Sequence, residues 1–343
     1  MPTFSSTREI GDSSFLSIGY GGMGISAYYG AAAPDEQRFK VLDVVYENGI
    51  THWDTADAYG DSEKLMGQWF KRTGKRKEIF LATKFGMGRH WGSDFKRNVN
   101  GEPDYVPKAL QRSLDQLGVD YVDLWYLHRA DIAVPIERTV KAMAEQVKAG
   151  KVRYLGLSEV SAETLRRAHA VHPISVVQVE YSPFTTDIED EKIGLLKTTR
   201  ELGVKIVAYG ALGRGLLTGK YKGPEDFAED DYRRTIPRNS KENFPNILKI
   251  ADGLKKVGEK HGATAGQVAL AWVLAQGNDI IPIVGTTKVE NLKENLGALK
   301  VKLTAQDIAE VRRLAEAANA AGGHRYPESM MQYVFADTPP LQK

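Results

Sequence analysis

The chain has 343 residues and no cysteine. Disulfide bonds and thiol catalysis are therefore excluded, and the composition fits a reducing compartment. An excess of one charge is also missing, because 46 basic residues face 44 acidic ones and the formal net charge is +2. This balance gives no reason to expect nucleic acid or an anionic membrane as the main partner.

Long apolar runs are missing as well. No stretch approaches the roughly 18 apolar residues that a membrane-spanning helix needs. Residues 1–11 are polar and lack the apolar core of a signal peptide. We therefore expect a soluble, cytoplasmic protein. Its hydrophobic fraction of 42% is ample for a full core, and 343 residues fit one large barrel or two ordinary domains.

Short apolar runs alternate with longer amphipathic segments along the chain. Candidate strands lie near residues 15–20, 50–54, 79–84, 122–127, 152–157, 175–179, 204–208 and 280–283. Helical patterns lie near residues 35–48, 62–72, 105–117, 136–149, 161–170, 189–201, 265–276 and 288–298. Several helices end in glycine just before the next strand, which suits a left-handed C-cap: Gly49, Gly118, Gly150 and Gly203. Eight strand-then-helix units predict a (β/α)₈ TIM barrel that spans residues 1–343 as a single domain.

The chain is longer than such a barrel requires, since ~250 residues suffice without insertions. Residues 85–104 show no clear period, and residues 218–246 are charged and contain proline. We expect these stretches to form long loops after strands 3 and 7. Residues 304–307 read Thr-Ala-Gln-Asp, which resembles a capping box, so a C-terminal helical tail is expected from about residue 304.

Residues 19–24 satisfy the pattern G-x-G-x-x-G after the first strand-like run. This pattern binds a dinucleotide only when a helix begins at its third glycine. Here the helical pattern resumes only after Pro34, and no acidic residue closes a second strand about 20 positions on. We therefore interpret the segment as a loop, either merely flexible or one whose glycines let the backbone approach a ligand at the barrel mouth.

Four ionisable residues lie at or just past the ends of three successive apolar runs. Asp54 ends the first run and Tyr59 follows five residues later, Lys84 ends the second run, and His128 ends the third. Burying a charged group costs free energy unless the group is paired or hydrogen-bonded. In a parallel sheet all four gather at the C-terminal ends of the strands, where barrel enzymes hold their active sites. Separate salt bridges and helix caps are the alternative interpretation.

The four residue types suit proton delivery to a carbonyl oxygen. A phenol has a reference pKa of ~10, and an adjacent ammonium lowers it. Lys84 is the candidate ammonium, Asp54 would hold it in place, and His128 would bind the substrate oxygen or relay a proton. No metal site is expected, because His169 and His172 form only an isolated H-x-x-H pair. A metal-dependent barrel hydrolase would need a larger cluster.

At this point the motifs resemble those of the aldo-keto reductase family. The matching segments are residues 54–60, 81–84, 124–128, 156–158, 178–182, 208–215, 282–287 and 294–295, in the family's order and spacing. The resemblance covers roughly residues 15–335. It implies a barrel that reduces aldehydes or ketones with NAD(P)H, and a catalytic tetrad of Asp54, Tyr59, Lys84 and His128 in which Tyr59 is the general acid.

The resemblance also implies which residues hold the cofactor. Ser158 and Gln178 would bind the nicotinamide carboxamide, and Tyr209 would stack on the ring. The remaining positions supply backbone near the cofactor, the phosphate site and the adenine site: Gly22, Met23, Gly210, Leu212, Gly215, Gly285, Thr286, Thr287, Lys288, Glu294 and Asn295. A solvated helix face is the alternative reading of Glu294.

The chain departs from the family pattern at several cofactor positions. Glu159 replaces the asparagine that follows the nicotinamide-binding serine in many members. Residues 285–286 read Gly-Thr in place of Lys-Ser, and Asn291 replaces an arginine. Because Lys288 restores the positive charge, we expect NADPH rather than NADH. Residues 323–326, Gly-His-Arg-Tyr, resemble the branch that includes plant, yeast and other fungal aldehyde and pyridoxal-type reductases.

The predicted substrate pocket is lined by loop residues and the tail. Its candidates are Tyr28, Tyr29, Trp91, Phe95 and Met330, whose character suits an aromatic or apolar aldehyde; the alternative is that they pack on one another. Residues 218–246 carry several Lys and Arg residues and would close over the cofactor. A slow-turnover binding or regulatory subunit of the same fold stays open as a second function. The physiological substrate, the reaction direction and the choice between monomer and homo-oligomer are left open.

Overall fold

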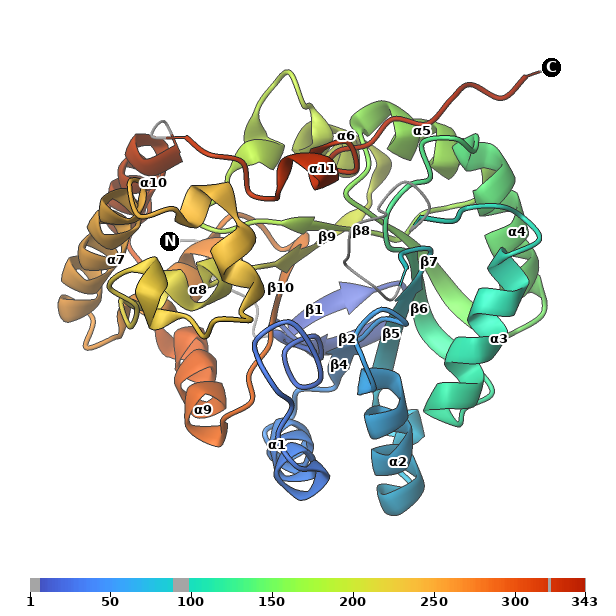
Figure 1. Cartoon of the computed structure of the whole chain (residues 1–343), viewed down its shortest axis with the longest axis horizontal. Coiled ribbons are helices and arrows are strands. Elements are labelled where there is room, and N and C mark those ends of the chain that lie inside the picture. The colour runs from blue at the N-terminus through green and yellow to red at the C-terminus, as the bar shows by residue number, and fades with distance from the viewer. Residues whose placement is uncertain (1–6, 89–98, 320–321, 343) are drawn as a thin grey trace.

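The computed structural model describes residues 7–88, 99–319 and 322–342. Eight parallel strands close into a barrel in the order β10-β3-β4-β5-β6-β7-β8-β9 (Figure 1). The barrel strands are β3 (Gly19–Gly21), β4 (His52–Asp54), β5 (Phe80–Phe85), β6 (Val122–Leu127), β7 (Val152–Ser158), β8 (Val176–Glu180), β9 (Lys205–Tyr209) and β10 (Ile280–Val284). The predicted TIM barrel is confirmed.

Helices form a ring outside the strands (Figure 1). They are α1 (Asp35–Glu47), α2 (Ser62–Thr73), α3 (Val106–Leu117), α4 (Ile136–Lys148), α5 (Ala162–Val171), α6 (Leu195–Leu202), α7 (Phe244–Glu259), α8 (Ala265–Ala275) and α9 (Val289–Gly297). The four predicted C-cap glycines all have positive φ, between 62° and 76°. Helix α6 begins six residues later than predicted. Helix α7 was not predicted, although Ile247, Ile250, Leu254 and Val257 are buried at helical spacing.

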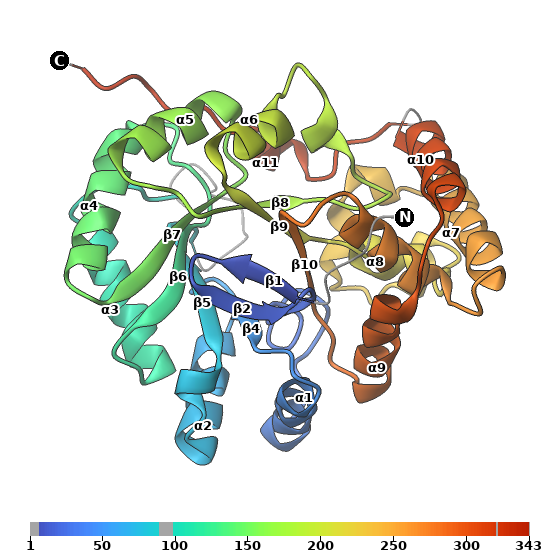
Figure 2. The same cartoon turned by 180° about the vertical axis from the view of Figure 1, so that it is seen from behind.

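An N-terminal hairpin lies across the bottom of the barrel and was also not predicted (Figure 2). Strands β1 (Thr7–Ile10) and β2 (Ser13–Leu16) pair antiparallel around a turn at Gly11. The run at residues 15–20 is therefore split between β2 and β3. Phe15 of the hairpin packs against Phe80, with ring centroids 5.2 Å apart. The hairpin thus closes the end opposite the C-terminal ends of the strands.

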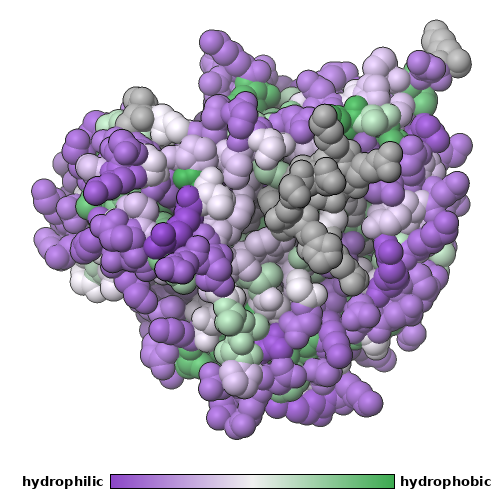
Figure 3. All heavy atoms as spheres, viewed as in Figure 1, coloured by the Kyte–Doolittle hydropathy of each residue, from purple (hydrophilic) through white to green (hydrophobic). Residues whose placement is uncertain are grey.

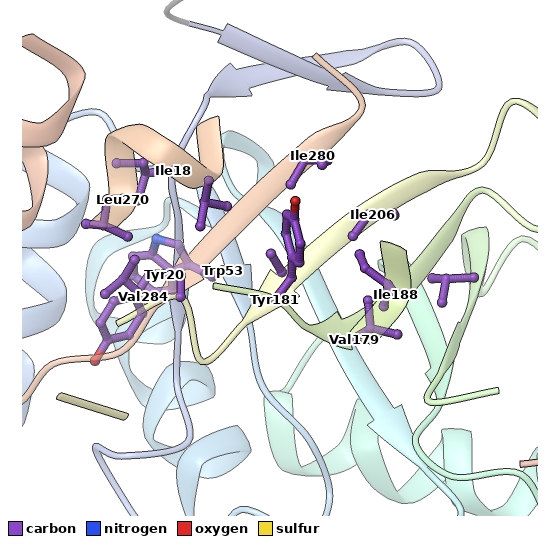
Figure 4. Packing of buried hydrophobic residues seen from close by; sticks show 14 of the residues in the cluster. Ile18, Tyr20, Trp53, Val179, Tyr181, Ile188, Ile206, Leu270, Ile280 and Val284 are labelled. Atoms are coloured by element: carbon purple, nitrogen blue, oxygen red, sulfur yellow. The ribbon is translucent and has the colours of Figure 1, made fainter. Parts of the chain in front are cut away.

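The alternation of side chains along each strand separates two cores. Outward-facing residues such as Trp53 and Val284 belong to the larger apolar cluster, which includes Leu270 of α8 (Figure 4), and Trp53 packs on Trp69 and Phe70 of α2. Inward-facing residues near the strand starts, such as Phe80 and Leu124, form a smaller apolar cluster with the hairpin. Because the strand period is two, polar residues further along the same inward rows lie above this cluster, at the C-terminal ends.

Long loops follow the third and seventh barrel strands, as predicted. The first connects β5 to α3, and its residues 89–98 lie outside the described residues. The second connects β9 to α7 through short 3₁₀ helices, η4 (Gly213–Thr218), η5 (Pro224–Asp226), η6 (Tyr232–Thr235) and η7 (Pro237–Asn239). None of the helices in the described part of the chain is long and apolar enough to cross a membrane.

The predicted C-terminal tail consists of α10 (Ala305–Asn319), α11 (Glu328–Met331) and an extended end. Figure 1 shows α11 and the extended end running along the upper rim of the barrel. The backbone of Ala336 pairs with Val160, just after β7, and its N–H donates to the carbonyl of Glu159 at 2.9 Å. The tail is therefore fixed beside the C-terminal ends of the strands.

Candidate active site

The four predicted catalytic residues converge at the C-terminal ends of the strands. Asp54 is the last residue of β4 and continues the inward row of His52. Lys84 continues the row of Phe80 and Ala82 in β5, and His128 continues that of Leu124 and Tyr126 in β6. Tyr59 reaches the same place from the loop after β4, with the Lys84 ammonium 4.8 Å from its ring centroid. All four side chains are at least nine-tenths buried.

Asp54 and Lys84 form a buried ion pair. The Lys84 ammonium donates to Asp54 Oδ1 and, at 2.8 Å, to the carbonyl oxygen of Thr55. Gln178 Nε2 donates to the other carboxylate oxygen, Asp54 Oδ2, at 2.8 Å. Burial raises the pKa of Asp54 and lowers that of Lys84, and the attraction between them opposes both shifts. Each group therefore depends on the other for its charge and position.

Tyr59 and His128 form the second half of the site. The phenol oxygen lies 3.4 Å from His128 Nε2, and the two rings meet edge to face. Burial has the largest effect on the pKa of Tyr59 and the nearby Asp54 carboxylate the next largest, and both raise it well above 10. Burial, Lys84 and Arg129 lower the pKa of His128 well below 6.5. At neutral pH the phenol is therefore protonated and the imidazole is neutral.

The expected lowering of the Tyr59 pKa is wrong for this structure, because the net shift is upward. Among the described residues, the Lys84 ammonium donates to Asp54 and Thr55 and faces the ring of Tyr59 rather than its hydroxyl. The desolvation of the phenolate and the repulsion from the Asp54 carboxylate outweigh the attraction to the positive charge of Arg129. The result still suits a general acid, because the phenol holds its proton until a substrate oxygen takes it.

A cavity of about 590 Å³ opens above the tetrad, within the size range of small-molecule sites. Asp54, Tyr59 and His128 form part of its wall. Most predicted cofactor residues also line it: Met23, Ser158, Gln178, Tyr209, Gly210, Leu212, Gly215, Gly285, Thr286, Thr287, Lys288, Glu294 and Asn295. Figure 3 views the same end of the molecule as Figure 1, and hydrophilic side chains form most of the visible surface.

Gly22 and Lys84 lie behind the cavity wall rather than in it. The N–H of Gly22 donates to the carbonyl of Asp54 at 2.7 Å. A Cβ on Gly22 would lie 2.5 Å from Met66 Cε and 3.1 Å from that carbonyl. The glycine pattern thus allows β3 to pack closely against β4 and α2. No helix begins at Gly24, which agrees with our rejection of a dinucleotide fingerprint.

One end of the cavity is the start of α9, directly after β10. Thr286 Oγ1 accepts a hydrogen bond from the Lys288 N–H at 3.0 Å. The hydroxyl of Tyr20 donates to the Thr286 carbonyl at 3.1 Å. Helix α9 has nine residues, and the partial positive charge at its N-terminus faces this end. Together with the Lys288 side chain, it forms a candidate phosphate site.

The loop after β9 forms the next part of the wall. Gly210, Gly213, Arg214 and Gly215 all have positive φ, between 55° and 92°. A Cβ at Gly210 would lie 3.1 Å from Glu180 Cγ, so glycine allows the loop to lie close to β8. Further along, Arg233 donates to the Arg214 carbonyl at 3.0 Å and lines the cavity. Part of the basic segment 218–246 therefore does lie beside this cavity.

The predicted substrate residues fall into three groups. Tyr28 and Tyr29 line the cavity, and the ring of Tyr28 meets Tyr59 edge to face with centroids 6.1 Å apart. Trp91 and Phe95 lie outside the described residues. Met330 is buried in a cluster with Tyr326 and is not part of the cavity wall.

A buried ionic cluster behind Tyr209 was not predicted. Both terminal nitrogens of Arg325 donate to the Glu159 carboxylate. The Tyr209 hydroxyl donates to the same carboxylate at 2.7 Å and lies 2.7 Å from the Tyr326 hydroxyl. Burial alone would raise the pKa of Glu159, but Arg325 and Arg129 outweigh it and lower that pKa to about 2. The tail is thus coupled to the residue expected to stack on nicotinamide.

Two features of the sequence pointed to this cluster separately. Glu159 departs from the family pattern, and residues 323–326 form a recognisable tail motif. Their pairing was not visible, because 166 positions separate Glu159 from Arg325. Glu159 also has a φ of 54°, a conformation that asparagine tolerates better than glutamate. The contacts with Arg325 and Tyr209 hold it there.

Replacing Arg325 with methionine is expected to lower the free energy of unfolding by about 2 kcal/mol. Breaking a buried ion pair usually costs ~3–5 kcal/mol. The loss is smaller here because Tyr209 and, at 3.6 Å, Arg129 remain near Glu159. Urea unfolding measures the change, with Arg313→Met on the exposed face of α10 as a control. Equal stability of the two variants would contradict a role for the cluster in holding the tail.

No group of three or more metal-ligating side chains occurs within the described ranges. His169 of the H-x-x-H pair accepts a hydrogen bond at Nδ1 from the Ile174 N–H at 3.2 Å. This contact fixes the end of α5 against the start of β8. His169 therefore has a structural use.

Comparisons with known proteins agree with this geometry. The sequence pattern described as the Aldo/keto reductase family matches residues 17–316. The chain is 56% identical to aldo-keto reductase str7 of Strobilurus tenacellus, over 98% of both chains. It is 48% identical to aldo-keto reductase yakc of Schizosaccharomyces pombe, whose name specifies NADP(+), over 98% of this chain and 99% of the relative.

Solved structures show the same similarity. A glycerol dehydrogenase from Gluconobacter oxydans superimposes with a TM-score of 0.79 at 26% identity, covering 98% of this chain and 99% of its own. A thermostable aldo-keto reductase in complex with the inhibitor epalrestat gives a TM-score of 0.72 at 30% identity, over 90% and 99% of the two chains. The family match spans most of the sequence, and the chain therefore belongs to the aldo/keto reductase family.

Proposed function

We propose that this protein reduces aldehydes, and some ketones, to alcohols with NADPH, and that Tyr59 is the general acid. One observation supports the proposal above all others. Tyr59, His128 and Asp54, which pairs with Lys84 behind the wall, line the same cavity whose far end is the start of α9. A proton donor and a phosphate site thus share one continuous space.

The residues around the cavity fit NADPH. Ser158 and Gln178 offer a hydroxyl and an amide for the nicotinamide carboxamide, and Tyr209 offers a ring for stacking. The start of α9 and Lys288 offer N–H groups and a positive charge for a phosphate. When bound, NADPH supplies the hydride for the carbonyl carbon. The name of the Schizosaccharomyces pombe relative supports the choice of cofactor.

The chain's own residues supply the proton and hold the substrate oxygen. Tyr59 donates its proton to the carbonyl oxygen as negative charge develops there. Neutral His128 lies 3.4 Å from the same phenol oxygen and orients the substrate oxygen beside it. Lys84 stabilises the phenolate that remains, because its ammonium lies 4.8 Å from the Tyr59 ring. Asp54 keeps Lys84 charged in this buried position.

A panel of aldehydes and ketones, assayed with NADPH and NADH side by side, tests the proposal. We expect the absorbance of NADPH at 340 nm to fall with several aldehydes and to fall more slowly with ketones. A protein that binds NADPH tightly but turns over none of the panel would instead be a binding or regulatory subunit.

Lys288→Ala is expected to raise the KM for NADPH by about 10-fold, equivalent to ~1.4 kcal/mol, with little change in the KM for NADH. The reason is that only NADPH carries the 2′-phosphate that the Lys288 charge would bind. Lys293→Ala is the matched control, since Lys293 lies exposed on the same helix and outside the cavity wall. If the KM rises equally for both cofactors, Lys288 does not select the phosphate.

A further inference from the structure

Arg129 is a buried cation at the cavity wall that the reaction described above does not use. It directly follows His128, its side chain is 3% exposed, and it lines the cavity. Its Nη1 donates to the Tyr333 carbonyl at 3.5 Å, the outer limit of a hydrogen bond, and lies 3.6 Å from Glu159 Oε2. Its Nε has no hydrogen-bond partner among the described residues. A guanidinium has five N–H donors, so most of its capacity is left over.

The neighbouring carboxylates are already paired with other cations. Glu159 accepts two hydrogen bonds from Arg325. Glu180 accepts from Arg214 at 3.0 Å and lies 3.4 Å from Arg325. The buried part of the cluster thus has three guanidinium groups, those of Arg129, Arg214 and Arg325, and two carboxylates. Of the three, Arg129 has the most distant carboxylate partner, Glu159 Oε2 at 3.6 Å.

Asp187 does not balance this surplus. Its carboxylate lies 3.4 Å from the Nε of Arg325, is 31% exposed, and has no ion pair with Arg129 among the described residues. Burying a charge whose carboxylate partner is distant and shared with another cation is expensive. A buried guanidinium at a cavity wall therefore indicates that a negative group from outside the chain binds there.

The cofactor phosphates are in the wrong place to be that group. In the closed barrel β6 lies four strands from β10 in either direction, so the two strands are on opposite sides. The candidate phosphate site follows β10, whereas Arg129 follows β6. Arg129 is thus on the side of the cavity where the substrate carbonyl is proposed to bind, beside His128.

Aromatic rings surround the same part of the cavity. The Arg129 guanidinium lies 5.1 Å from the centroid of the Tyr326 ring. Tyr232 meets Tyr28 edge to face at 6.2 Å, and Tyr28 meets Tyr59 in the same way at 6.1 Å. Tyr28, Tyr232 and Tyr326 all line the cavity. Such a wall favours a flat, unsaturated ligand.

We propose that Arg129 binds a carboxylate of the substrate, and that the preferred substrates are aromatic aldehydes carrying a carboxylate on the ring. This inference depends on the proposed reductase function. Arginine suits the role because its planar fork of donors matches the two oxygens of a carboxylate. Arg129 is then a specificity-determining residue, while Tyr59 and His128 act on the carbonyl at the other end of the substrate.

The test compares charged and neutral aldehydes of the same shape. The 2-, 3- and 4-carboxybenzaldehydes are assayed with NADPH against the corresponding carbamoylbenzaldehydes, in the wild type and in Arg129→Met and Arg129→Lys. We expect the wild type to prefer at least one carboxylate isomer over its amide by about 10-fold or more in kcat/KM. This ratio should fall to near one in Arg129→Met and recover in part in Arg129→Lys.

Binding measured without turnover gives a second readout. Calorimetry with 4-(hydroxymethyl)benzoate, a product of the expected class, should show binding to the wild type with NADP(+) and at least about 10-fold weaker binding to Arg129→Met. The wild type should bind 4-(hydroxymethyl)benzamide more weakly than the acid.

The outcomes separate this proposal from the function on which it rests. Turnover of amides and acids at equal efficiency by the wild type overturns the role of Arg129 but keeps the reductase. An equal fall in kcat/KM for the acids and the amides in Arg129→Met, with their ratio unchanged, shows that Arg129 only supports Glu159. That result overturns the proposal too. If no aldehyde is reduced, the reductase function itself is overturned, even if the carboxylate compounds bind.

Discussion

Replacing Tyr59 with phenylalanine should lower kcat for carbonyl reduction by about 10³-fold while NADPH binds as before. Positioned general acids contribute ~10²–10⁴-fold, and the phenol is the proton donor beside His128. The ring itself stays, so its edge-to-face contacts with Tyr28 and His128 are preserved. Steady-state kinetics with an aldehyde measures the loss, and quenching of protein fluorescence measures NADPH binding.

Tyr28→Phe is the matched control for this experiment. Tyr28 lines the same cavity, but its hydroxyl donates to the Ala58 carbonyl at 3.3 Å rather than pointing to His128. We expect a loss of only a few-fold in kcat for that variant. Near-normal turnover by Tyr59→Phe, or equal losses in the two variants, would show that another group delivers the proton.

The barrel and the tetrad were predictable because both depend on local rules. Strand and helix periods follow from short stretches of sequence, and parallel strands carry their end residues to one edge. Asp54, Lys84 and His128 each end an apolar run, so their convergence follows from topology alone. The prediction needed no knowledge of side-chain contacts.

The parts that were missed depend on contacts between distant segments. The hairpin of β1 and β2 is stabilised by its contact with the bottom of the barrel, where Phe15 packs on Phe80, and this contact is not evident from the local sequence. The pairing of Arg325 with Glu159 joins the tail to the end of β7. The direction of the Tyr59 pKa was missed for a related reason, since burial cannot be read from the order of residues. Desolvation then exceeded the lowering effect of positive charge on the Tyr59 pKa.

Lys84→Met should lower the free energy of unfolding by ~3–5 kcal/mol, because it leaves the Asp54 carboxylate buried without its cation. It should also lower kcat by at least about 10²-fold, since the phenolate of Tyr59 loses the positive charge beside its ring. Urea unfolding and aldehyde reduction measure the two effects separately. If activity is lost only because the protein unfolds, kcat per folded molecule will be normal.

The double variant Lys84→Met with Asp54→Asn separates structure from catalysis. Neutralising Asp54 removes the unpaired buried charge, so we expect at least about 2 kcal/mol of the lost stability to return, the coupling expected of directly contacting residues. Gln178 Nε2 can still donate to the amide oxygen that takes the place of Asp54 Oδ2. Activity should not return, because no charge near Tyr59 has been restored. If kcat recovered together with stability, the buried pair would be a structural support and Lys84 would have no part in stabilising the phenolate.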